Sequence, residues 1–381
     1  MRIVIATTSD LALPRGDTVR ILALAGGLHD AGHEVHLVCS GPAEIPGGLK
    51  DLARGVLVRR VNRPQARQGL LAALRHSLNV LRTAGAMAHD VLQVEFAFDA
   101  GLARIAGVRG YVVDVHGLLF AEQRLNFGNF RGRPPAFICR WIERFGVRGA
   151  RHAVVVSEPM ARFLTEQWGI PSAQVALVAN GYIEEKIRRQ LSKSRATGPS
   201  QKAVFVGNIA RWASVDRIVH AAEILRQRGR EVFVEILGDG ADRGRVERLA
   251  KERGLDSVTF RGYVPSDEAH VAMASAAVVL CPLDADLALE VACPIKILEY
   301  MALGRPIVAD GVGELPELLR KGQAAFISDG TIESFADCIE QALADAEESR
   351  RRAERASRIA QGLGWKSQTE RLNQFLSEVG S

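Results

Sequence analysis

Ala203-Val204-Phe205-Val206-Gly207 is a short apolar run that ends in glycine. A segment with helical spacing follows from about Val215 to Arg228, and the next apolar run extends from Val232 to Leu237. This alternation of buried strands and helices is typical of β-α-β units, which form a parallel sheet covered by helices on both faces. The segment therefore predicts a doubly wound α/β domain in the second half of the chain.

The first half of the chain has the same rhythm. Its apolar runs are Arg2 to Ala6, Glu34 to Cys39, Val56 to Val61, Val91 to Phe96, Tyr111 to Val115, Ala153 to Val156 and Val175 to Val178. From Tyr182 to Gln201 the rhythm is lost in a polar stretch with Gly, Pro and Ser, which is typical of a linker. The predicted division is a Rossmann-like domain at 1–180, a linker at 181–201, a second Rossmann-like domain at 202–363 and a last helix at 364–381.

Length and composition limit the class of protein. The chain has 381 residues, of which 47% are hydrophobic and 24% charged, so two globular domains are expected. No run approaches the roughly 18 apolar residues that cross a bilayer, and Arg2 to Ala6 is strand-like where a signal peptide would stand, so we expect a cytoplasmic protein. The five cysteines lack the spacing of a disulfide framework or a zinc site. The net charge of +5 fits an anionic partner without choosing among phosphates, lipid headgroups and nucleic acid.

The segment from Cys293 to Ala309 carries the most chemical information. Pro294 suits the first turn of a helix, and Gly304 suits its C-terminal cap. Lys296 and Glu299 stand three residues apart, on one helix face near the N-terminal end. They are either a ligand-binding pair or a charge pair on a solvated face.

A glycine-containing turn follows the strand that ends at Leu237. Gly238 and Gly240 let the backbone approach a ligand, and the helix that begins around Arg243 offers free N–H groups to an anion. Arg243 also stands where the dinucleotide-binding pattern needs its third glycine, which argues against a nicotinamide oxidoreductase. A plain strand-to-helix turn is the alternative.

Taken in order, these motifs resemble the large group 1, or family 4, of retaining glycosyltransferases with the GT-B fold. The resemblance covers nearly the whole chain and rests on Gly32 to Val35, Val178 to Gly181, Phe205 to Gly207, Leu237 to Gly240, Val258 to Gly262, Pro294 to Ala309 and Gly313 to Leu319. It implies two Rossmann-like domains that face a central cleft. The first would bind the acceptor and the second the nucleotide sugar, and the last helix would pack back on the first domain.

The resemblance also assigns donor-binding residues. Glu299 is expected to accept hydrogen bonds from both ribose hydroxyls, a task suited to the two oxygens of a carboxylate. The other residues assigned to the donor are Gly16, Asp17, Arg211, Gly238, Gly240, Lys296, Ile297 and Leu298.

This chain departs from the family pattern at two places. The family often has a second acidic residue where this chain has Val291, so its catalytic role passes to the neighbouring Glu290. The family's basic pair for the diphosphate falls at Asn208 and Ala213. Positive charge for the phosphates must then come from other side chains, for which the candidates are Arg211, Lys296 and Arg15.

In the first half, Leu13 to Arg20 resembles the family's glycine loop, in which Gly16 permits close approach of the backbone to the donor and acceptor. Arg15 and Arg20 are assigned to the acceptor side as sources of charge. His116 follows a strand end, and the resemblance implies that it contacts the transferred sugar as a catalytic residue, although a lone histidine is more often structural. Asp114, also assigned to the acceptor side, either orients the ring of His116 or ends the strand.

Arginines and aromatic residues are interleaved in the segment 124–151. The members are Arg124, Arg131, Arg133, Arg140, Arg144, Arg148, Arg151, Phe127, Phe130, Phe137, Trp141 and Phe145, with Glu143 as the one acid. This segment is either a surface for peripheral membrane contact at the inner face of the membrane or a core helix with snorkelling arginines. It is too limited to indicate nucleic-acid binding.

The sequence thus predicts a metal-independent glycosyltransferase without a cofactor. Its donor would be a UDP- or GDP-sugar, and its acceptor a glycan, a lipid-linked molecule or a small molecule. Helix N-termini and basic side chains would meet the phosphate charge in place of Mg²⁺. The main rival hypothesis is a catalytically silent relative that binds a sugar nucleotide or a partner transferase, which Asn208, Ala213 and Val291 favour.

Overall fold

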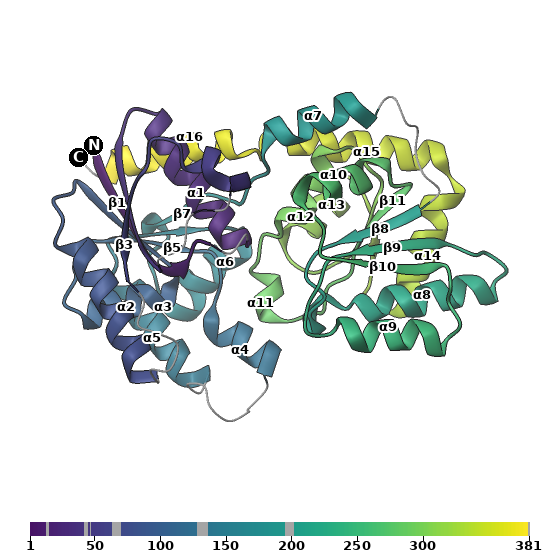
Figure 1. Cartoon of the computed structure of the whole chain (residues 1–381), viewed down its shortest axis with the longest axis horizontal. Helices are drawn as coiled ribbons and strands as arrows, with labels where there is room; N and C mark the ends of the chain where they lie inside the picture. Colours follow the sequence, from purple (N-terminus) through teal and green to yellow (C-terminus); the bar gives the residue numbers. More distant parts are fainter. Residues whose placement is uncertain are drawn as a thin grey trace. The chain divides into compact units, whose positions relative to one another are not determined.

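The computed structural model describes residues 1–12, 15–41, 45, 47–62, 70–127, 136–194 and 202–379. The chain forms two compact units (Figure 1). The first unit comprises Met1–Asn180, Val291–Cys293 and Trp365–Ser381, and the second comprises Gly181–Glu290 and Pro294–Gly364. Both units are therefore discontinuous in the sequence.

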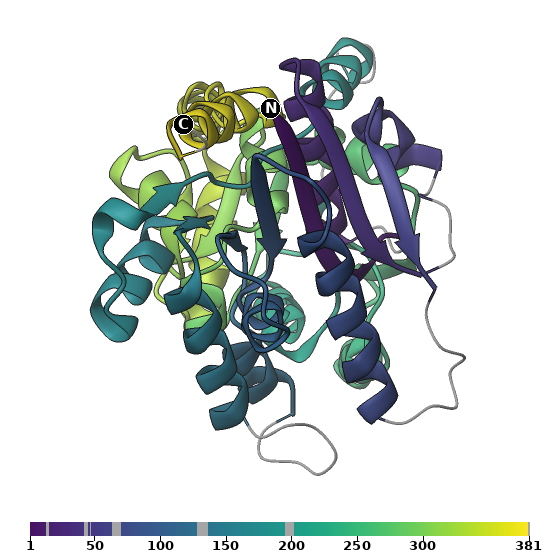
Figure 2. The ribbon, with the colours of Figure 1, turned by 90° about the vertical axis from the view of Figure 1, so that its left-hand side faces the viewer.

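The first unit contains a seven-stranded parallel sheet with the order β3-β2-β1-β4-β5-β6-β7 (Figure 2). Side chains from Ile3 to Ala6 are all fully buried, because helices cover both faces of the sheet. The strands are β1 (Arg2–Asp10), β2 (Glu34–Ser40), β3 (Leu57–Val61), β4 (Val91–Glu95), β5 (Val112–Val115), β6 (His152–Val155) and β7 (Val175–Leu177).

Helices cover the first sheet on both sides. They are α1 (Gly16–Asp30), α2 (Leu70–Gly85), α3 (Ala97–Ile105), α4 (Leu119–Phe127), α5 (Ala136–Gly149), α6 (Glu158–Arg162) and α16 (Trp365–Val379), with short turns η1 (Gly47–Ala53), η2 (Phe163–Gln167) and η3 (Ser172–Gln174). In Figure 1, α1 and α16 lie on one face, and α2, α3 and α5 on the other. The helix α16 packs closely on α1 at Gly27, where a Cβ atom would lie 2.4 Å from Thr369 Oγ1.

The second unit contains a six-stranded parallel sheet with the order β10-β9-β8-β11-β12-β13. Its strands are β8 (Lys202–Val206), β9 (Phe233–Leu237), β10 (Val258–Gly262), β11 (Val278–Cys281), β12 (Ile307–Asp310) and β13 (Phe326–Ser328). The predicted α/β fold with two doubly wound sheets is thus confirmed.

The helices of the second unit complete its two outer layers. They are α7 (Glu184–Ser194), α8 (Val215–Gln227), α9 (Arg243–Glu252), α10 (Ser266–Ser275), α11 (Leu287–Glu290), α12 (Ile295–Ala302), α13 (Glu314–Lys321), α14 (Ile332–Ala344) and α15 (Ala346–Ala360), with the 3-10 turn η4 (Arg211–Ala213). The core beneath α8 and α14 includes Phe205 and Phe335, both without exposed surface.

The stretch 181–201, predicted as a linker, contains α7 and belongs to the second unit. Ile187 and Gln190 lie on one side of this helix, and both are buried where α7 packs against α10. The prediction was wrong for 184–194. A helix that buries only a narrow stripe of its surface needs few apolar residues, so its sequence can be as polar as that of a linker. Residues 195–201 lie outside the described part of the chain.

Within the residues that the structure describes, none of the helices combines the length and the apolar character required to pass through a bilayer.

Candidate functional site

Each sheet has one point at which the strand order reverses. In the first unit this point lies between β1 and β4, and in the second between β8 and β11. Ligands of open α/β sheets bind beyond the carboxyl ends of the strands at such a point. Most of the predicted site residues follow these strands or their neighbours, so each unit presents one candidate surface.

His116 lies directly beyond β5 in the first unit and pairs with a buried carboxylate. Its Nε2 atom is 3.1 Å from Oε2 of Glu95, the last residue of β4, and both side chains are almost fully buried. Gln93 donates from Nε2 to the other oxygen of Glu95 at 2.8 Å. The sequence analysis missed Glu95, which is 21 residues from His116 and is brought beside it only by the pairing of β4 with β5.

An unusual backbone conformation fixes the other side of the His116 ring. Phe96 has a φ of 67°, in the left-handed region that residues other than glycine rarely adopt. Its ring centroid lies 4.2 Å from that of His116. Such strain persists only where the surroundings determine the conformation, and it often accompanies functional positions.

The surroundings of His116 favour its charged form. Burial opposes the charge, but the hydrogen bond to Glu95 and the negative charge of Asp114 outweigh it and raise the pKa of His116. The imidazolium therefore persists to higher pH than in a free histidine, and as a donor it can hydrogen-bond a sugar hydroxyl.

Replacing Glu95 by glutamine is expected to lower the pKa of His116, because the neutral amide cannot stabilise the imidazolium electrostatically. The histidine should then lose its charge at lower pH than in the parent protein. An NMR titration of the histidine Cε1 protons measures the change, with His36, which pairs with Glu34, as an internal control. An unchanged titration of His116 would show that Glu95 does not set its charge.

Arg20 and Asp114 form a buried structural pair. All five N–H bonds of the Arg20 guanidinium are used: two bind Asp114, each at 2.9 Å, and the others reach the carbonyls of Val178 and Ala179 and Oδ1 of Asn180. Neither Arg20 nor Asp114 has exposed surface. The structure thus gives both residues a structural role, and no N–H donor of Arg20 is left for a ligand. Their predicted acceptor-binding roles stay predictions.

The predicted glycine loop is shorter than expected. Gly16 is the first residue of α1, and the N–H of Val19 donates to the Arg15 carbonyl at 3.0 Å, so Gly16 to Arg20 are helical. This part of the prediction was wrong because Ile21 and its neighbours extend the buried face of α1 to its first turn. Arg15 is exposed and Asp17 half-buried, and their ligand-binding roles stay predictions. Leu13 and Pro14 lie outside the described residues.

In the second unit, Gly238 and Gly240 allow two loops to approach each other. A Cβ atom on Gly238 would lie 1.8 Å from the Gly207 carbonyl oxygen, and one on Gly240 would lie 2.4 Å from the Ile209 carbonyl oxygen. Gly238 also has a φ of 141°. Backbone thus occupies the space beside both glycines. Their predicted contact with the donor stays a prediction, and close packing already accounts for their lack of side chains.

Gly238→Ala is expected to lower the free energy of unfolding by about 2 kcal/mol, the scale of an overpacked core position. Gly244→Ala, in α9, is the matched control, since the nearest atom to its Cβ would be 3.6 Å away in the flexible Arg248 side chain. The control should gain about 0.5–1 kcal/mol through helix propensity. Urea denaturation of both variants measures the difference, and equal stabilities would contradict the steric argument.

Lys296 lies at the start of α12, beside the loop that follows β8. Its Nζ atom is 4.6 Å from the centroid of the Phe205 ring and would be 3.6 Å from a Cβ atom on Gly207. In the part of the chain that the structure describes, no carboxylate forms an ion pair with Lys296. The first backbone N–H groups of α12 have no partner within the helix, so they add positive potential at the same place.

Glu299 lies one turn after Lys296 and pairs with a histidine that the sequence analysis missed. Its Oε1 atom is 3.1 Å from Nε2 of His270, in α10, and Nδ1 of His270 is 2.6 Å from the Ser266 carbonyl oxygen. Burial opposes the charged form of His270, but the hydrogen bond to Glu299 outweighs it and raises the pKa of His270. His270 thus orients Glu299, and among the residues that the structure describes no hydrogen bond to the other oxygen of Glu299 is seen.

The remaining predicted residues of this region differ in exposure. Glu290 ends α11 with an exposed side chain, so its catalytic role stays a prediction. Ile297 and Leu298 have no exposed surface, so their side chains pack in the core and only their backbone could contact a donor. Arg211 is exposed beside a polar pocket of about 570 Å³ whose lining includes neither Lys296 nor Glu299.

Within the segment 124–151, the helix α5 has one buried face and one exposed face, and its predicted contact with a membrane stays a prediction. One face of α5 is core: Gly146 packs on α3, and Glu143 accepts hydrogen bonds from the N–H groups of Leu119 and Phe120 at 2.7 and 3.1 Å. The opposite face is solvent-exposed, with Phe137 at 72% and Trp141 at 62% of their full exposure. Arg140, Arg144 and Arg148 are exposed as well. Phe130, Arg131 and Arg133 lie outside the described residues.

Known structures share this fold. Sucrose-phosphate synthase from Thermosynechococcus elongatus superposes with a TM-score of 0.80 at 17% identity, covering 99% of this chain and 98% of that one. The Anabaena HepE protein, solved in complex with UDP-glucose, gives a TM-score of 0.75 at 19% identity and covers 99% and 100%. The fold is therefore that of the GT-B glycosyltransferases.

Sequence comparisons identify the family. Residues 15–181 match the family described as Glycosyl transferase 4-like domain, and residues 200–345 match Glycosyl transferases group 1. The alpha-D-kanosaminyltransferase of Streptomyces kanamyceticus is 27% identical over 304 residues, which is 77% of each chain. The chain belongs to the group 1, or family 4, glycosyltransferases, and it is a glycosyltransferase enzyme, as the sequence motifs predicted.

Proposed function

We propose that the protein transfers a sugar from a nucleotide-diphosphate sugar, with a UDP-sugar as the first candidate, to an acceptor hydroxyl. The observation that carries the proposal is the placement of Lys296 and Glu299 one turn apart in α12. Lys296 lies beside Gly207, the residue that follows β8. A cation and a helix N-terminus suit a diphosphate, and a carboxylate suits the two ribose hydroxyls. The HepE protein, which has the same fold, binds UDP-glucose.

In this proposal the phosphate charge is met by protein groups, and the reaction needs neither a metal ion nor a cofactor. Lys296 and the free N–H groups of α12 stabilise the negative charge that grows on the leaving diphosphate. His116 holds the transferred sugar by a hydrogen bond. The proposed reaction retains the anomeric configuration, with a donor phosphate oxygen as the base, and the resemblance to a retaining family supports this part of the proposal.

A thermal-shift screen of UDP-, GDP- and ADP-sugars tests the donor, because a ligand that binds only the native state raises its stability. Turnover with the donor found should then survive EDTA, and NMR of the product should show the anomeric configuration of the donor. Loss of turnover on chelation, restored by Mg²⁺ or Mn²⁺, would refute the metal-independent mechanism.

The exposed face of α5 supports peripheral contact with an anionic membrane as part of the same proposal. Phe137 and Trp141 present apolar surface beside Arg140, Arg144 and Arg148, the combination found in helices that lie in the membrane interface. Such contact would suit a lipid-linked acceptor; a glycan or a small molecule is the alternative.

Cosedimentation with phosphatidylglycerol vesicles is expected to capture the protein and to weaken markedly in Trp141→Ser. Phosphatidylcholine vesicles are the neutral control, and Tyr263→Ser removes another exposed aromatic residue, from the second unit. Equal binding of Trp141→Ser and the parent protein would exclude α5 as the contact.

A further inference from the structure

The second unit contains a cavity at the amino ends of its strands, whereas the candidate donor residues lie at the carboxyl ends. Its wall includes Phe233, Ala277 and Pro306, which stand at or just before the first residues of β9, β11 and β12. Gly207, Gly238 and Lys296 belong instead to the carboxyl ends of the strands. The cavity has a volume of about 870 Å³ and is closed on one side by α14 and α15. This site is therefore distinct from the proposed donor site.

One cation in the wall lacks a counter-charge. Arg230 pairs with Glu340, and Arg350 pairs with Glu354. Among the described residues, by contrast, Nε of Arg305 is buried without a hydrogen-bond partner, and no carboxylate pairs with its guanidinium. Burial lowers the pKa of Arg305, because the charged guanidinium is partly removed from water. The other carboxylate of the wall, Glu231, is exposed at the rim.

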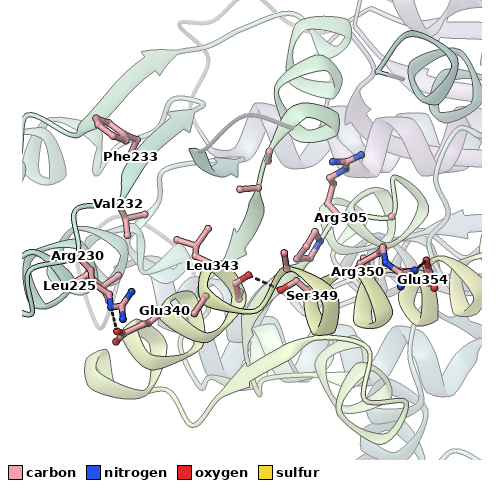
Figure 3. Close-up of a pocket in the computed structure, with 18 of the residues that line it drawn as sticks. Leu225, Arg230, Val232, Phe233, Arg305, Glu340, Leu343, Ser349, Arg350 and Glu354 are labelled. Atoms are coloured by element: carbon pink, nitrogen blue, oxygen red, sulfur yellow. Dashed lines mark hydrogen bonds and ion pairs between the residues drawn. The ribbon is translucent and has the colours of Figure 1, made fainter. Parts of the chain in front are cut away.

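The rest of the wall is largely apolar. Leu225, Val232 and Ala353 are buried, Leu343 is half-buried and Phe233 is exposed. Figure 3 shows Val232, Phe233 and Leu343 on one side of the cavity and Arg305 and Arg350 on the other. The Ser349 hydroxyl already donates to the Ala342 carbonyl at 2.6 Å, so it is not free to bind a polar ligand. The cavity thus combines the guanidinium of Arg305, which has no counter-charge, with a largely apolar wall.

We infer that this cavity binds an amphiphilic anion, in which a carboxylate or phosphate head pairs with Arg305 and a hydrocarbon chain lies against Leu343 and Phe233. The planar guanidinium presents its N–H groups in a fork that matches two oxygens of such a head. The hydrocarbon chain replaces water along the apolar wall, which is the favourable contribution that an inorganic anion lacks.

Calorimetry with the full chain tests the inference with dodecanoate and dodecyl phosphate, both below their micelle concentrations. We expect both to bind, and the tighter of the two identifies the head group. Dodecyl maltoside has the same chain without the charge, and inorganic phosphate has the charge without the chain. Equal binding of the maltoside would show that Arg305 selects no anion, and equal binding of inorganic phosphate would show that the apolar wall contributes nothing. Either result overturns the inference, as does failure of both anions to bind.

Variants locate the site. Arg305→Gln should weaken anion binding at least about tenfold, the scale of a charge-assisted hydrogen bond. Arg350→Gln is the matched control, because Glu354 already compensates the charge of Arg350. The affinity of this variant for the two anions should stay within about threefold of that of the parent protein. Ala346→Trp, at an exposed position of the wall, should block the cavity and abolish binding without removing a charge. If Arg305→Gln fails to fold, Ala346→Trp alone decides, and unchanged binding in that variant would refute the site.

Discussion

Turnover in His116→Ala is expected to fall about 100-fold, while the affinity for the donor stays within about threefold, because the residue is proposed to hold the transferred sugar and not the nucleotide. The pairing with Glu95 and the contact with Phe96 fix the position of the imidazole ring. In His116→Ala, no neighbouring group is therefore expected to take over its hydrogen bond to the sugar. Steady-state kinetics with the donor found in the thermal-shift screen measure kcat, and calorimetry measures donor affinity.

His36→Ala is the matched control, since His36 lies on β2 and pairs only with Glu34 among the contacts described. It should leave kcat unchanged. Equal kcat values for His116→Ala and the parent protein would return His116 to a structural role, in which it serves only to compensate the buried charge of Glu95. A parallel fall in thermal stability and kcat would support the same conclusion.

Lys296→Ala is expected to weaken binding of the nucleoside diphosphate by about 1.5–3 kcal/mol, the scale of a hydrogen bond to a charged group. The two phosphates cannot enter a partly desolvated site without compensation, and the family's usual basic pair is replaced here by Asn208 and Ala213. Calorimetry with the nucleoside and the nucleoside diphosphate separates the phosphate contribution from the rest. Only the diphosphate should be affected.

Two further variants sharpen this test. Lys296→Met keeps the apolar stem beside Phe205 and removes only the charge, so it should match Lys296→Ala. Glu299→Ala should weaken nucleoside and diphosphate alike, because it removes the ribose contacts. If Lys296→Ala weakens both ligands equally, or neither, Lys296 does not hold the phosphates, and the exposed Arg211 becomes the next candidate.

Local signals predicted α12 well. Pro294 precedes α12, and Gly304, with a φ of 61°, follows it, as the capping preferences of proline and glycine require. The strand rhythm likewise predicted both parallel sheets, because strands buried on both faces are continuous apolar runs. These features depend on a few adjacent residues, so one sequence suffices to find them.

Contacts between distant residues could not be predicted in the same way. Arg20 and Asp114 are 94 positions apart. Nothing in the sequence indicates that Arg20 donates all its hydrogen bonds to Asp114 and to the three residues that follow β7. His270 and Glu299 are 29 positions apart and meet only because α10 and α12 belong to one layer of the second unit. The sequence therefore indicated these charged residues, but not the internal pairs in which the structure holds them.

The packing of α16 on α1 has a consequence for synthesis. Domains of a growing chain generally fold as units, with the N-terminal one first. Here the first unit needs Trp365–Ser381, whereas the second is complete at Gly364. On the ribosome, the half of the protein that is translated first therefore waits for its last helix, with Gly27 and its neighbours on α1 uncovered until Thr369 emerges.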